Sequence, residues 1–321
     1  MAVINSGWTY VDRITAKLAG QTVLDFYTTH YRHSDRATWQ GRIEAGQVLI
    51  NDQPATPETV LEKGQTLTYH RSPWCEPEVP LDLPILYQDQ DLWAVHKPAG
   101  LPVLPGGEFV HHTVLQQLKY QFPDHPLFPL HRLGRGTSGV LLLGRSPLAR
   151  QSLSQQFREH HCRKIYRTLV TPGNLPDQFD CHQAIGKIPY AQLGYVYAAT
   201  PDGKPAFSKG RILARFADKT LVEVEIQTGR PHQIRIHLAA LGFPLLNDPL
   251  YTVGGIPDAS QQAIPSDIGY WLHAHHLGFS HPRTKTWTAI NAPLPDALQM
   301  PGEKTDKIPT DFCRVSPPFS P

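Results

Sequence analysis

A proline-rich segment near the N-terminus divides the chain into two parts. Residues 72–84 contain four prolines and two glutamates. Proline fixes φ and lacks a backbone N–H, so this density of prolines prevents both a helix and a central strand and indicates a stiff linker. The 321 residues are 40% hydrophobic, which is enough to bury a substantial core. We therefore expect a small domain over residues 1–71 and a large one over residues 85–298.

The first 71 residues show the cap and turn signals of a small α/β module. Ser34 can cap a helix that ends before Gly46, because Ser suits a helix N-cap and Gly a C-terminal stop. Two strands are expected after it, over residues 48–50 and 66–70. This order resembles the S4 RNA-binding module. The alternative is an N-terminal extension that packs on the rest of the chain.

The large domain alternates short apolar strands with a few helices from Ile85 to about Pro295. That pattern predicts an α+β fold with a mixed, mostly antiparallel sheet. The segment 299–321 is charged and then proline-rich, and we expect it to be a disordered tail. The formal charge of +2 neither requires nor excludes a nucleic acid partner.

Compartment signals point to the cytoplasm. The N-terminal residues lack a secretory pattern, and no apolar run approaches the roughly 18 residues of a membrane span. The cysteines are scattered, which favours a reducing compartment over a disulfide framework. They are Cys75, Cys162, Cys181 and Cys313.

Residues 131–139 form a polar, cationic loop with the sequence HRLGRGTSG, followed by an apolar strand over residues 140–143. Arginines and hydroxyls at the start of a central strand suit an anionic ligand. Gly134, Gly136 and Gly139 also match the dinucleotide pattern G-x-G-x-x-G. That pattern requires a helix directly after the loop, so that the pyrophosphate meets its N-terminus. Because a strand follows instead, no nucleotide cofactor is expected.

A second polar segment joins a half-buried strand to a helix. Val222, Val224 and Ile226 alternate with polar residues, and Pro231 is placed to open a helix that ends at Gly242. The intervening Arg230 would then lie at a helix N-terminus, where an anion is favoured.

Four histidines between residues 273 and 281 invite a zinc interpretation. No carboxylate or thiolate is placed to complete the shell, so no metal is expected.

Five segments in this order resemble the RluA-type pseudouridine synthases. They are VHKPAGLPV at 95–103; the loop HRLGRGTSG at 131–139, similar to H-R-L-D-x-x-T-S-G; RKIYR at 163–167; TGRPHQIRIH at 228–237 with Asp248 and Tyr251; and LHAHHLGFSHP at 272–282. The resemblance implies an RNA-modifying isomerase without metal or organic cofactor. It also implies rRNA or tRNA as the partner and a monomeric protein.

The resemblance assigns roles to individual residues. It implies that Tyr166 packs against the target base and that Arg230 pairs with the family's catalytic aspartate. Gly134 occupies the position of that aspartate. The expected RNA contacts are Arg132, Arg135, Thr137, Ser138, Arg163, Lys164, His232, Gln233 and Arg235.

The glycine at position 134 leaves two functions open. Pseudouridine formation breaks the C1′–N1 bond of a flipped uridine and joins C1′ to C5, and a carboxylate acts as nucleophile at C1′ or as base at C2′. Glycine supplies neither group. The chain is then either a pseudouridine synthase that uses another group, with Asp248 as one candidate, or a non-catalytic RNA-binding protein. Arg230, without its aspartate, should pair with RNA phosphate or with another carboxylate.

Overall fold

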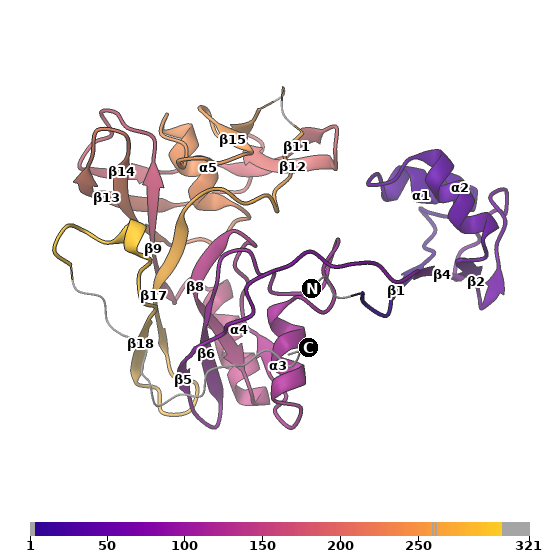
Figure 1. Cartoon of the computed structure of the whole chain (residues 1–321), viewed down its shortest axis with the longest axis horizontal. Coiled ribbons are helices and arrows are strands. Elements are labelled where there is room, and N and C mark those ends of the chain that lie inside the picture. The colour runs from indigo at the N-terminus through magenta and orange to yellow at the C-terminus, as the bar shows by residue number, and fades with distance from the viewer. Residues whose placement is uncertain (1–3, 259, 261, 304–321) are drawn as a thin grey trace. The chain divides into compact units, whose positions relative to one another are not determined.

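The computed structural model describes residues 4–258, 260 and 262–303, and the chain divides into two compact units (Figure 1). The first comprises Met1–Pro77 with Pro189–Tyr195, and the second comprises Glu78–Ile188 with Val196–Pro321. The division between Pro77 and Glu78 falls inside the segment predicted to be a linker.

The first unit combines two helices with a four-stranded sheet in the order β1-β4-β2-β3. Its core is aromatic: Trp39 stacks on Tyr27 with ring centroids 4.4 Å apart, and the Arg42 guanidinium lies 4.7 Å from the Trp39 ring centre. The elements are β1 (Trp8–Arg13), α1 (Val23–His30), α2 (Arg36–Glu44), β2 (Val48–Ile50), β3 (Gln53–Pro54) and β4 (Thr66–Arg71).

The helix α2 begins one residue later than predicted. Asp35 is its N-cap and accepts a hydrogen bond from the Thr38 backbone N–H at 2.8 Å. Ser34 instead accepts from the Arg42 guanidinium at 3.0 Å. Both residues could cap a helix, and the carboxylate is the stronger acceptor at a helix N-terminus. The strands at 48–50 and near 66–70 are present, whereas β1 and α1 were not predicted. The likeness to an S4 module stays a prediction.

The second unit is built on a mixed sheet of ten strands with the central order β10-β13-β14-β9-β17-β8-β6-β5. Strands β8 and β17 run parallel, whereas β17 with β9, β9 with β14 and β8 with β6 are antiparallel. The predicted α+β class with a mostly antiparallel sheet is confirmed. The strands are β5 (Ile85–Gln88), β6 (Leu92–Lys97), β7 (Phe128–Pro129), β8 (Thr137–Gly144), β9 (Arg163–Val170), β10 (Gln178–Cys181), β13 (Ser208–Arg215), β14 (Thr220–Ile226), β17 (Leu272–Ser280) and β18 (Trp287–Asn291).

Smaller elements complete the second unit. The hairpin strands β11 (Ile185–Tyr190) and β12 (Gly194–Ala199) pair with each other, as do β15 (Tyr251–Thr252) and β16 (Ile256–Pro257). The helices are α3 (Val114–Gln121), α4 (Pro147–Arg158), α5 (Gln233–Ala240) and a 3-10 turn at Asp296–Leu298. Ser146 caps α4 by accepting from the Ala149 N–H at 3.1 Å.

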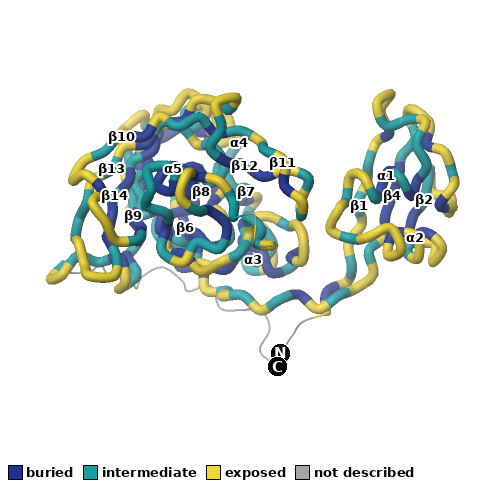
Figure 2. The backbone as a smooth tube through the Cα atoms, turned by 90° about the horizontal axis from the view of Figure 1, so that it is seen from above, coloured by how far each residue is buried: buried dark blue, intermediate teal, exposed yellow. Residues whose placement is uncertain are grey.

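Strand β8 separates two hydrophobic cores, because its side chains alternate between the two faces of the sheet. Leu141 and Leu143 belong to one core, and Val140 and Leu142 belong to the other. Figure 2 shows the central strands in dark blue, the colour of buried residues, and the loops largely in yellow. The arrangement fixes β8 firmly and therefore fixes the loop that precedes it.

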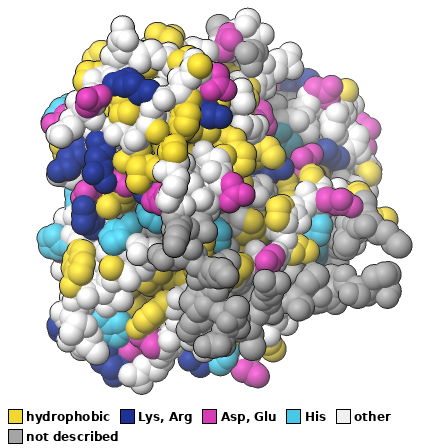
Figure 3. All heavy atoms as spheres, turned by 60° about the vertical axis from the view of Figure 1, so that its left-hand side comes forward, with side chains coloured by type: hydrophobic (Ala, Val, Ile, Leu, Met, Phe, Trp, Pro, Cys, Tyr) yellow, Lys and Arg dark blue, Asp and Glu magenta, His cyan; other side chains and the backbone are white. Residues whose placement is uncertain are grey.

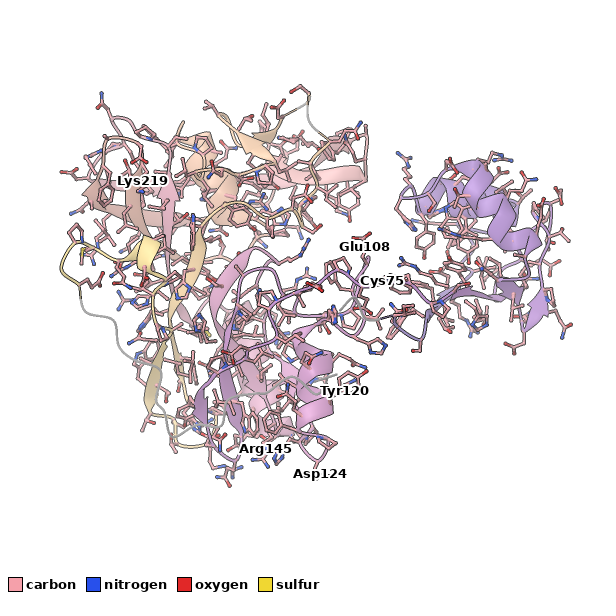
Figure 4. All side chains as sticks on the ribbon, viewed as in Figure 1. Cys75, Glu108, Tyr120, Asp124, Arg145 and Lys219 are labelled. Carbon is pink, nitrogen blue, oxygen red and sulfur yellow. The ribbon has the colours of Figure 1, made fainter. Side chains whose placement is uncertain are left out.

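The two ends of β8 differ in character. The loop 131–136 leads into the N-terminal end. At the other end Arg145, labelled in Figure 4, contacts His125 Nδ1 through its guanidinium at 2.8 Å. The candidate site therefore lies at the N-terminal end of β8, where β17 runs alongside with Leu272 opposite Thr137.

The turn between β14 and α5 is longer than predicted. Pro231 does not open the helix, because His232 adopts a left-handed conformation with φ of 55° and α5 begins at Gln233. Residues 228–232 consequently form a separate turn between the strand and the helix.

Residues 299–303 differ from the expected disordered tail. Glu303 forms a two-point ion pair with the buried Arg167, with N–O distances of 2.6 and 2.9 Å. The tail from residue 304 onward lies outside the described residues.

Basic and acidic side chains are interspersed on the face shown in Figure 3. Arg211 pairs with Glu223 at 2.8 Å, and Arg163 pairs with Glu225 at 3.2 Å. The positive charges on these strands are thus locally balanced. In the described part of the chain, no helix is both long enough and apolar enough to cross a bilayer.

Candidate functional site

A buried lysine anchors the loop 131–136. Lys97, at the end of β6, is completely inaccessible to solvent. Its ammonium group donates to the carbonyls of Leu101 at 2.7 Å, Pro98 at 2.8 Å and Arg135 at 3.2 Å. Three acceptors match the three donors of an ammonium group and compensate its burial. Sequence reasoning placed Lys97 only at a sheet edge, since its carbonyl partners carry no side-chain signal.

Two of the three glycines in residues 131–139 are required, because a side chain there would clash with neighbouring atoms. A Cβ on Gly136 would lie 2.8 Å from the Tyr270 ring, and one on Gly139 would lie 2.2 Å from the Ala274 carbonyl oxygen. Gly139 also has a φ of 112°, which disfavours other residues. Both positions therefore depend on glycine for the close approach of Tyr270 and of β17.

Gly134 has no such requirement. Its φ lies outside the left-handed region, and an added Cβ would meet only Thr137 Oγ1 at 3.4 Å and the Tyr270 hydroxyl at 3.7 Å. Both are ordinary van der Waals distances. A Cβ fits at position 134, and among the described residues no carboxylate oxygen lies within 4 Å of it.

Tyr166 lies on β9, opposite Val224 of β14 and Ala274 of β17. The ring is half-buried and packs against the core that contains Leu133, the residue before Gly134. Burial raises the pKa of Tyr166 to about 12. The side chain is therefore a neutral phenol at pH 7, next to the candidate loop.

Arg230 lies in the turn 228–232 and is only half-buried. Its backbone N–H donates to Gln233 Oε1 at 3.0 Å, and its side-chain Nε donates to the Pro205 carbonyl at 3.0 Å. Over residues 4–258, 260 and 262–303 no carboxylate pairs with it. Within these residues no carboxylate replaces the aspartate, and the pairing of Arg230 with RNA phosphate stays a prediction.

Lys164 holds the same turn from β9. Its ammonium group donates to the carbonyls of Gln227 at 3.1 Å and Thr228 at 3.3 Å, and the residue is buried. In this structure the cation positions the turn, and the RNA contact by Lys164 stays a prediction.

The start of β9 and the turn before α5 both lie near the loop 131–136. Burial, together with the charges of Arg235 and Arg132, lowers the pKa of His232 to about 3. Burial, together with the charge of Lys164, lowers the pKa of His131 to about 4. These influences require that the loop lie close to both the start of β9 and the turn before α5. The sequence analysis had grouped these segments only by resemblance.

His232 is held in one tautomer. Its Nδ1 lies 2.7 Å from the Tyr251 hydroxyl, and that hydroxyl donates to the Tyr197 carbonyl at 2.6 Å. Because the phenol has a single proton, His232 Nδ1 must be the donor to it. Nε2 is therefore unprotonated at neutral pH.

Two further predicted RNA contacts belong to the interior. Arg235 is 2% exposed and forms a two-point ion pair with Asp248 at 2.6 and 2.7 Å, with its guanidinium 4.3 Å from the Tyr270 ring centre. Gln233 is buried and bonds Phe207 and Ser208. Both side chains are held in interior networks in this structure, and their RNA contacts stay predictions.

Asp248 is also excluded as a substitute for the missing aspartate. Besides Arg235, its carboxylate accepts from the backbone N–H groups of Leu250 and Tyr251 at 2.9 and 3.1 Å. The Asp248 carboxylate is fully buried and is committed to this interior network by four hydrogen bonds.

The remaining predicted contacts differ in accessibility. Arg132 is exposed, whereas Arg135 is half-buried and donates to the Gly100 carbonyl at 3.1 Å. Arg163 is exposed but already paired with Glu225. Thr137 is 5% exposed, and Ser138 contacts His273 Nδ1 at 2.8 Å. The free cationic character of the site therefore comes mainly from Arg132 and Arg230.

The histidine-rich strand β17 does not form a metal centre. No group of three or more His, Cys, Asp or Glu side chains is arranged to hold a metal ion within the described ranges. His273 is buried and bonds Ser138, and His275 contacts the Ala292 carbonyl at 3.0 Å.

Comparison with known proteins identifies the family. A family model described as RNA pseudouridylate synthase matches residues 91–240. An uncharacterized RNA pseudouridine synthase of Synechocystis is 62% identical over 90% of this chain and 99% of its own length. RNA pseudouridine synthase 5 of Arabidopsis thaliana is 41% identical over 92% of this chain and 95% of its own length. The chain belongs to the RNA pseudouridine synthase family, whose members are isomerases.

The fold agrees with this assignment. The solved structure of human RNA pseudouridylate synthase domain containing 1 aligns with a TM-score of 0.55 and 24% identity, over 70% of this chain and 89% of that one. The predicted RluA-type resemblance and the predicted fold are confirmed at the level of family and architecture.

Buried histidines make the stability of this protein sensitive to acid. Burial lowers the pKa of His131 and His237 to about 4 and of His232 and His273 to about 3, below the usual 6.5. The unfolded state therefore binds protons that the folded state excludes, and stability is lost as the pH falls below 6.5. We expect a loss of about 1.4 kcal/mol per pH unit for each histidine. Urea unfolding at pH 7.5, 6 and 5 measures it, and an unchanged midpoint would contradict the burial of these rings.

Proposed function

We propose that this chain binds RNA on the surface formed by the loop 131–136, the start of β9 and the turn 228–232, and acts there as a slow pseudouridine synthase. The observation that carries the proposal is the space at Gly134: in the part of the chain that the structure describes, no carboxylate oxygen lies within 4 Å of a Cβ at this position. The slow rate follows, because removal of a central catalytic group typically costs several orders of magnitude.

The site residues have distinct roles in this proposal. Arg132 and Arg230 pair with RNA phosphates, since both are accessible cations without a carboxylate partner in the described part of the chain. The flipped uridine stacks on Tyr166, whose neutral phenol can donate a hydrogen bond to the base. Lys97 and Lys164 hold the two segments in place through backbone carbonyls.

The reaction needs a group that this loop does not supply. Breaking the C1′–N1 bond leaves an electron-deficient C1′, and the family's carboxylate would bond to it or remove the C2′ proton. Thr137 Oγ1 and the Tyr270 hydroxyl are the heavy atoms nearest to position 134, and both are neutral oxygens. They are much weaker nucleophiles than a carboxylate at pH 7.

The same observation favours a second candidate, a non-catalytic RNA-binding protein on this scaffold. The two functions differ in the RNA that is recovered with the protein. Ultraviolet cross-linking in cells, followed by mapping of contact sites and pseudouridines, separates them. Pseudouridines at contact sites that vanish when the gene is deleted support the synthase. Contact sites whose pseudouridine content is unchanged by deletion support the binder.

The proposed cationic contact can be tested with a matched pair of variants. Arg230→Gln should weaken RNA binding and lower the slope of log affinity against log salt by about 1, because one phosphate contact is lost. Arg211→Gln removes the same charge from an exposed arginine that is paired with Glu223, and should leave both quantities unchanged. Equal effects from the two variants would show that only net charge matters.

The proposal also covers the substrate class, the compartment and the oligomeric state. We propose ribosomal or transfer RNA as the substrate class and a cytoplasmic monomer as the working form, with the first unit as an additional RNA contact. The three unpaired cysteines of the described ranges, Cys75, Cys162 and Cys181, support a reducing compartment. Light scattering of the purified protein measures its oligomeric state.

A further inference from the structure

A cavity adjoins the position of Gly134. It has a volume of about 250 Å³, and its lining includes Gly136, Ser138, Tyr270 and Leu272. Tyr270 connects it to position 134, because the Tyr270 hydroxyl lies 3.7 Å from the place of a Cβ on Gly134 and 2.9 Å from the place of one on Gly136. The cavity and the space at Gly134 are therefore neighbouring parts of one site.

Two hydroxyl groups converge on the space at Gly134. Thr137 Oγ1 and the Tyr270 hydroxyl are the atoms nearest to a Cβ at this position, at 3.4 and 3.7 Å. Both residues are more than nine-tenths buried, with 5% and 6% of their surfaces exposed. Neither oxygen forms a hydrogen bond with another described residue, and neither is sealed from solvent. Two buried hydroxyls with free protons are donors for an acceptor that the described chain does not supply.

The charges around the loop favour an anion as this acceptor. Residues 131–139 contain two arginines and no acidic residue. A third cation lies close to them, since the Lys97 ammonium group donates to the Arg135 carbonyl at 3.2 Å. Among the described residues no carboxylate oxygen lies within 4 Å of a Cβ at position 134. An anion there would meet hydrogen-bond donors and nearby positive charge, with no carboxylate in contact to repel it.

A small carboxylate matches the group that glycine lacks. The side chain that distinguishes aspartate from glycine is a carboxymethyl group, and formate and acetate carry the same carboxylate without the bond to the backbone. Two hydroxyl donors suit the two oxygens of such an ion. Formate should fit best, because the methyl group of acetate must stay roughly 3.5 Å from the backbone of Gly134, whereas a Cβ would be bonded to it.

We propose that the site at Gly134 takes up a small carboxylate from solution, held by Thr137 and Tyr270, and that this ion supplies the group missing from the loop. The inference rests on the proposed function as a synthase. One carboxylate oxygen bonds to C1′ of the flipped uridine, while the electron pair of the C1′–N1 bond passes to uracil N1. After the uracil turns, C5 bonds to C1′ and the carboxylate leaves with the electron pair that it had shared. The C5 hydrogen departs as a proton, so the carboxylate is regenerated.

Tritium release from RNA labelled at uridine C5 tests the proposal. The full-length protein is dialysed free of carboxylates and assayed on its cross-linked RNA target at constant ionic strength, with chloride replaced stepwise by formate. We expect wild-type release to rise with formate and to be roughly tenfold faster or more at about 0.5 M, with a smaller gain from acetate and none from propionate. The gain should stay below that of Gly134→Asp, because a free ion loses translational freedom on binding and a tethered side chain does not.

Matched anions and variants separate this chemistry from a salt effect. Nitrate is planar and nearly as small as formate but is a far weaker base, so it should give no gain. Gly134→Asp should not respond to formate, because its own carboxylate fills the place. Tyr270→Phe removes one donor and should raise the formate concentration for half of the maximal gain about fivefold. Tyr87→Phe removes a hydroxyl that donates to Asp89 at 2.6 Å, and should leave that concentration unchanged.

Direct binding of formate is the second readout. The carbon-13 signal of labelled formate should broaden with wild type and stay sharp with Gly134→Asp, whereas equal broadening by both would overturn the assignment of the site. The proposal is also overturned if formate accelerates wild type no more than nitrate does while Gly134→Asp releases tritium rapidly, or if formate accelerates both proteins equally. In these cases the proposed function stands. If neither protein releases tritium with any of the anions, the synthase function fails and this inference fails with it.

Discussion

Gly134→Asp is expected to raise the rate of pseudouridine formation by about a thousandfold or more, the scale on which single catalytic groups act. The expectation rests on local geometry. The backbone at position 134 is not in the left-handed region, and the nearest atoms to a new Cβ are Thr137 Oγ1 at 3.4 Å and the Tyr270 hydroxyl at 3.7 Å. A carboxylate can therefore be introduced without displacing the loop. Both neighbouring hydroxyls could donate hydrogen bonds to it.

Two control variants separate chemistry from structure. Gly134→Asn has nearly the same shape as the aspartate variant but no negative charge, so it should not increase the rate. Gly136→Ala lies two residues away, and its Cβ would meet the Tyr270 ring at 2.8 Å, so it should destabilise the loop. An equal gain from the asparagine variant would show that the carboxylate is not the missing element.

Asp248→Asn is expected to lower the free energy of unfolding by about 3–5 kcal/mol, because it leaves a buried cation unpaired. Arg235 is 2% exposed, and the Asp248 side chain is completely buried. The guanidinium also lies between the rings of Tyr270 and Tyr251, at 4.3 and 4.9 Å from their centres.

The matched control for this prediction is an ion pair at the surface. Glu225→Gln breaks the pair with the exposed Arg163 and should cost less than about 1 kcal/mol. Urea unfolding at pH 7.5 measures both variants. If Asp248→Asn unfolds at the urea midpoint of wild type, the buried pair is not the support that its geometry indicates.

Much of the architecture could be predicted from local patterns. The cap of α4 at Ser146 and the alternation along β14 fix those elements, because both signals lie within a few residues of the element itself. The start of α5 was misplaced, because the left-handed conformation of His232 depends on its bond to Tyr251, nineteen residues away. Proline at a helix start is a statistical preference, and this long-range contact overrides it.

The site was predictable as a set of segments but not as a set of contacts. Arg235, Gln233 and Lys164 carry polar or charged groups, and sequence alone cannot tell an interior network from an RNA surface. Asp248 shows why: it lies thirteen residues from Arg235, and only the fold brings the two together. The motif from Arg230 to Tyr251 is to a large extent a structural network that holds the turn next to the loop. Tyr270, whose hydroxyl lies 3.7 Å from the place of a Cβ at position 134, has no local sequence signal.

The most direct test of the central claim is the release of tritium from RNA labelled at uridine C5, with wild type and Gly134→Asp assayed on the same cross-linked RNA target. Bond formation between C5 and C1′ expels that hydrogen, so its release reports the reaction itself. We expect slow release by wild type and release about a thousandfold faster or more by the aspartate variant. Wild-type release at a rate equal to that of the variant would contradict the claim that the empty position at Gly134 limits this protein.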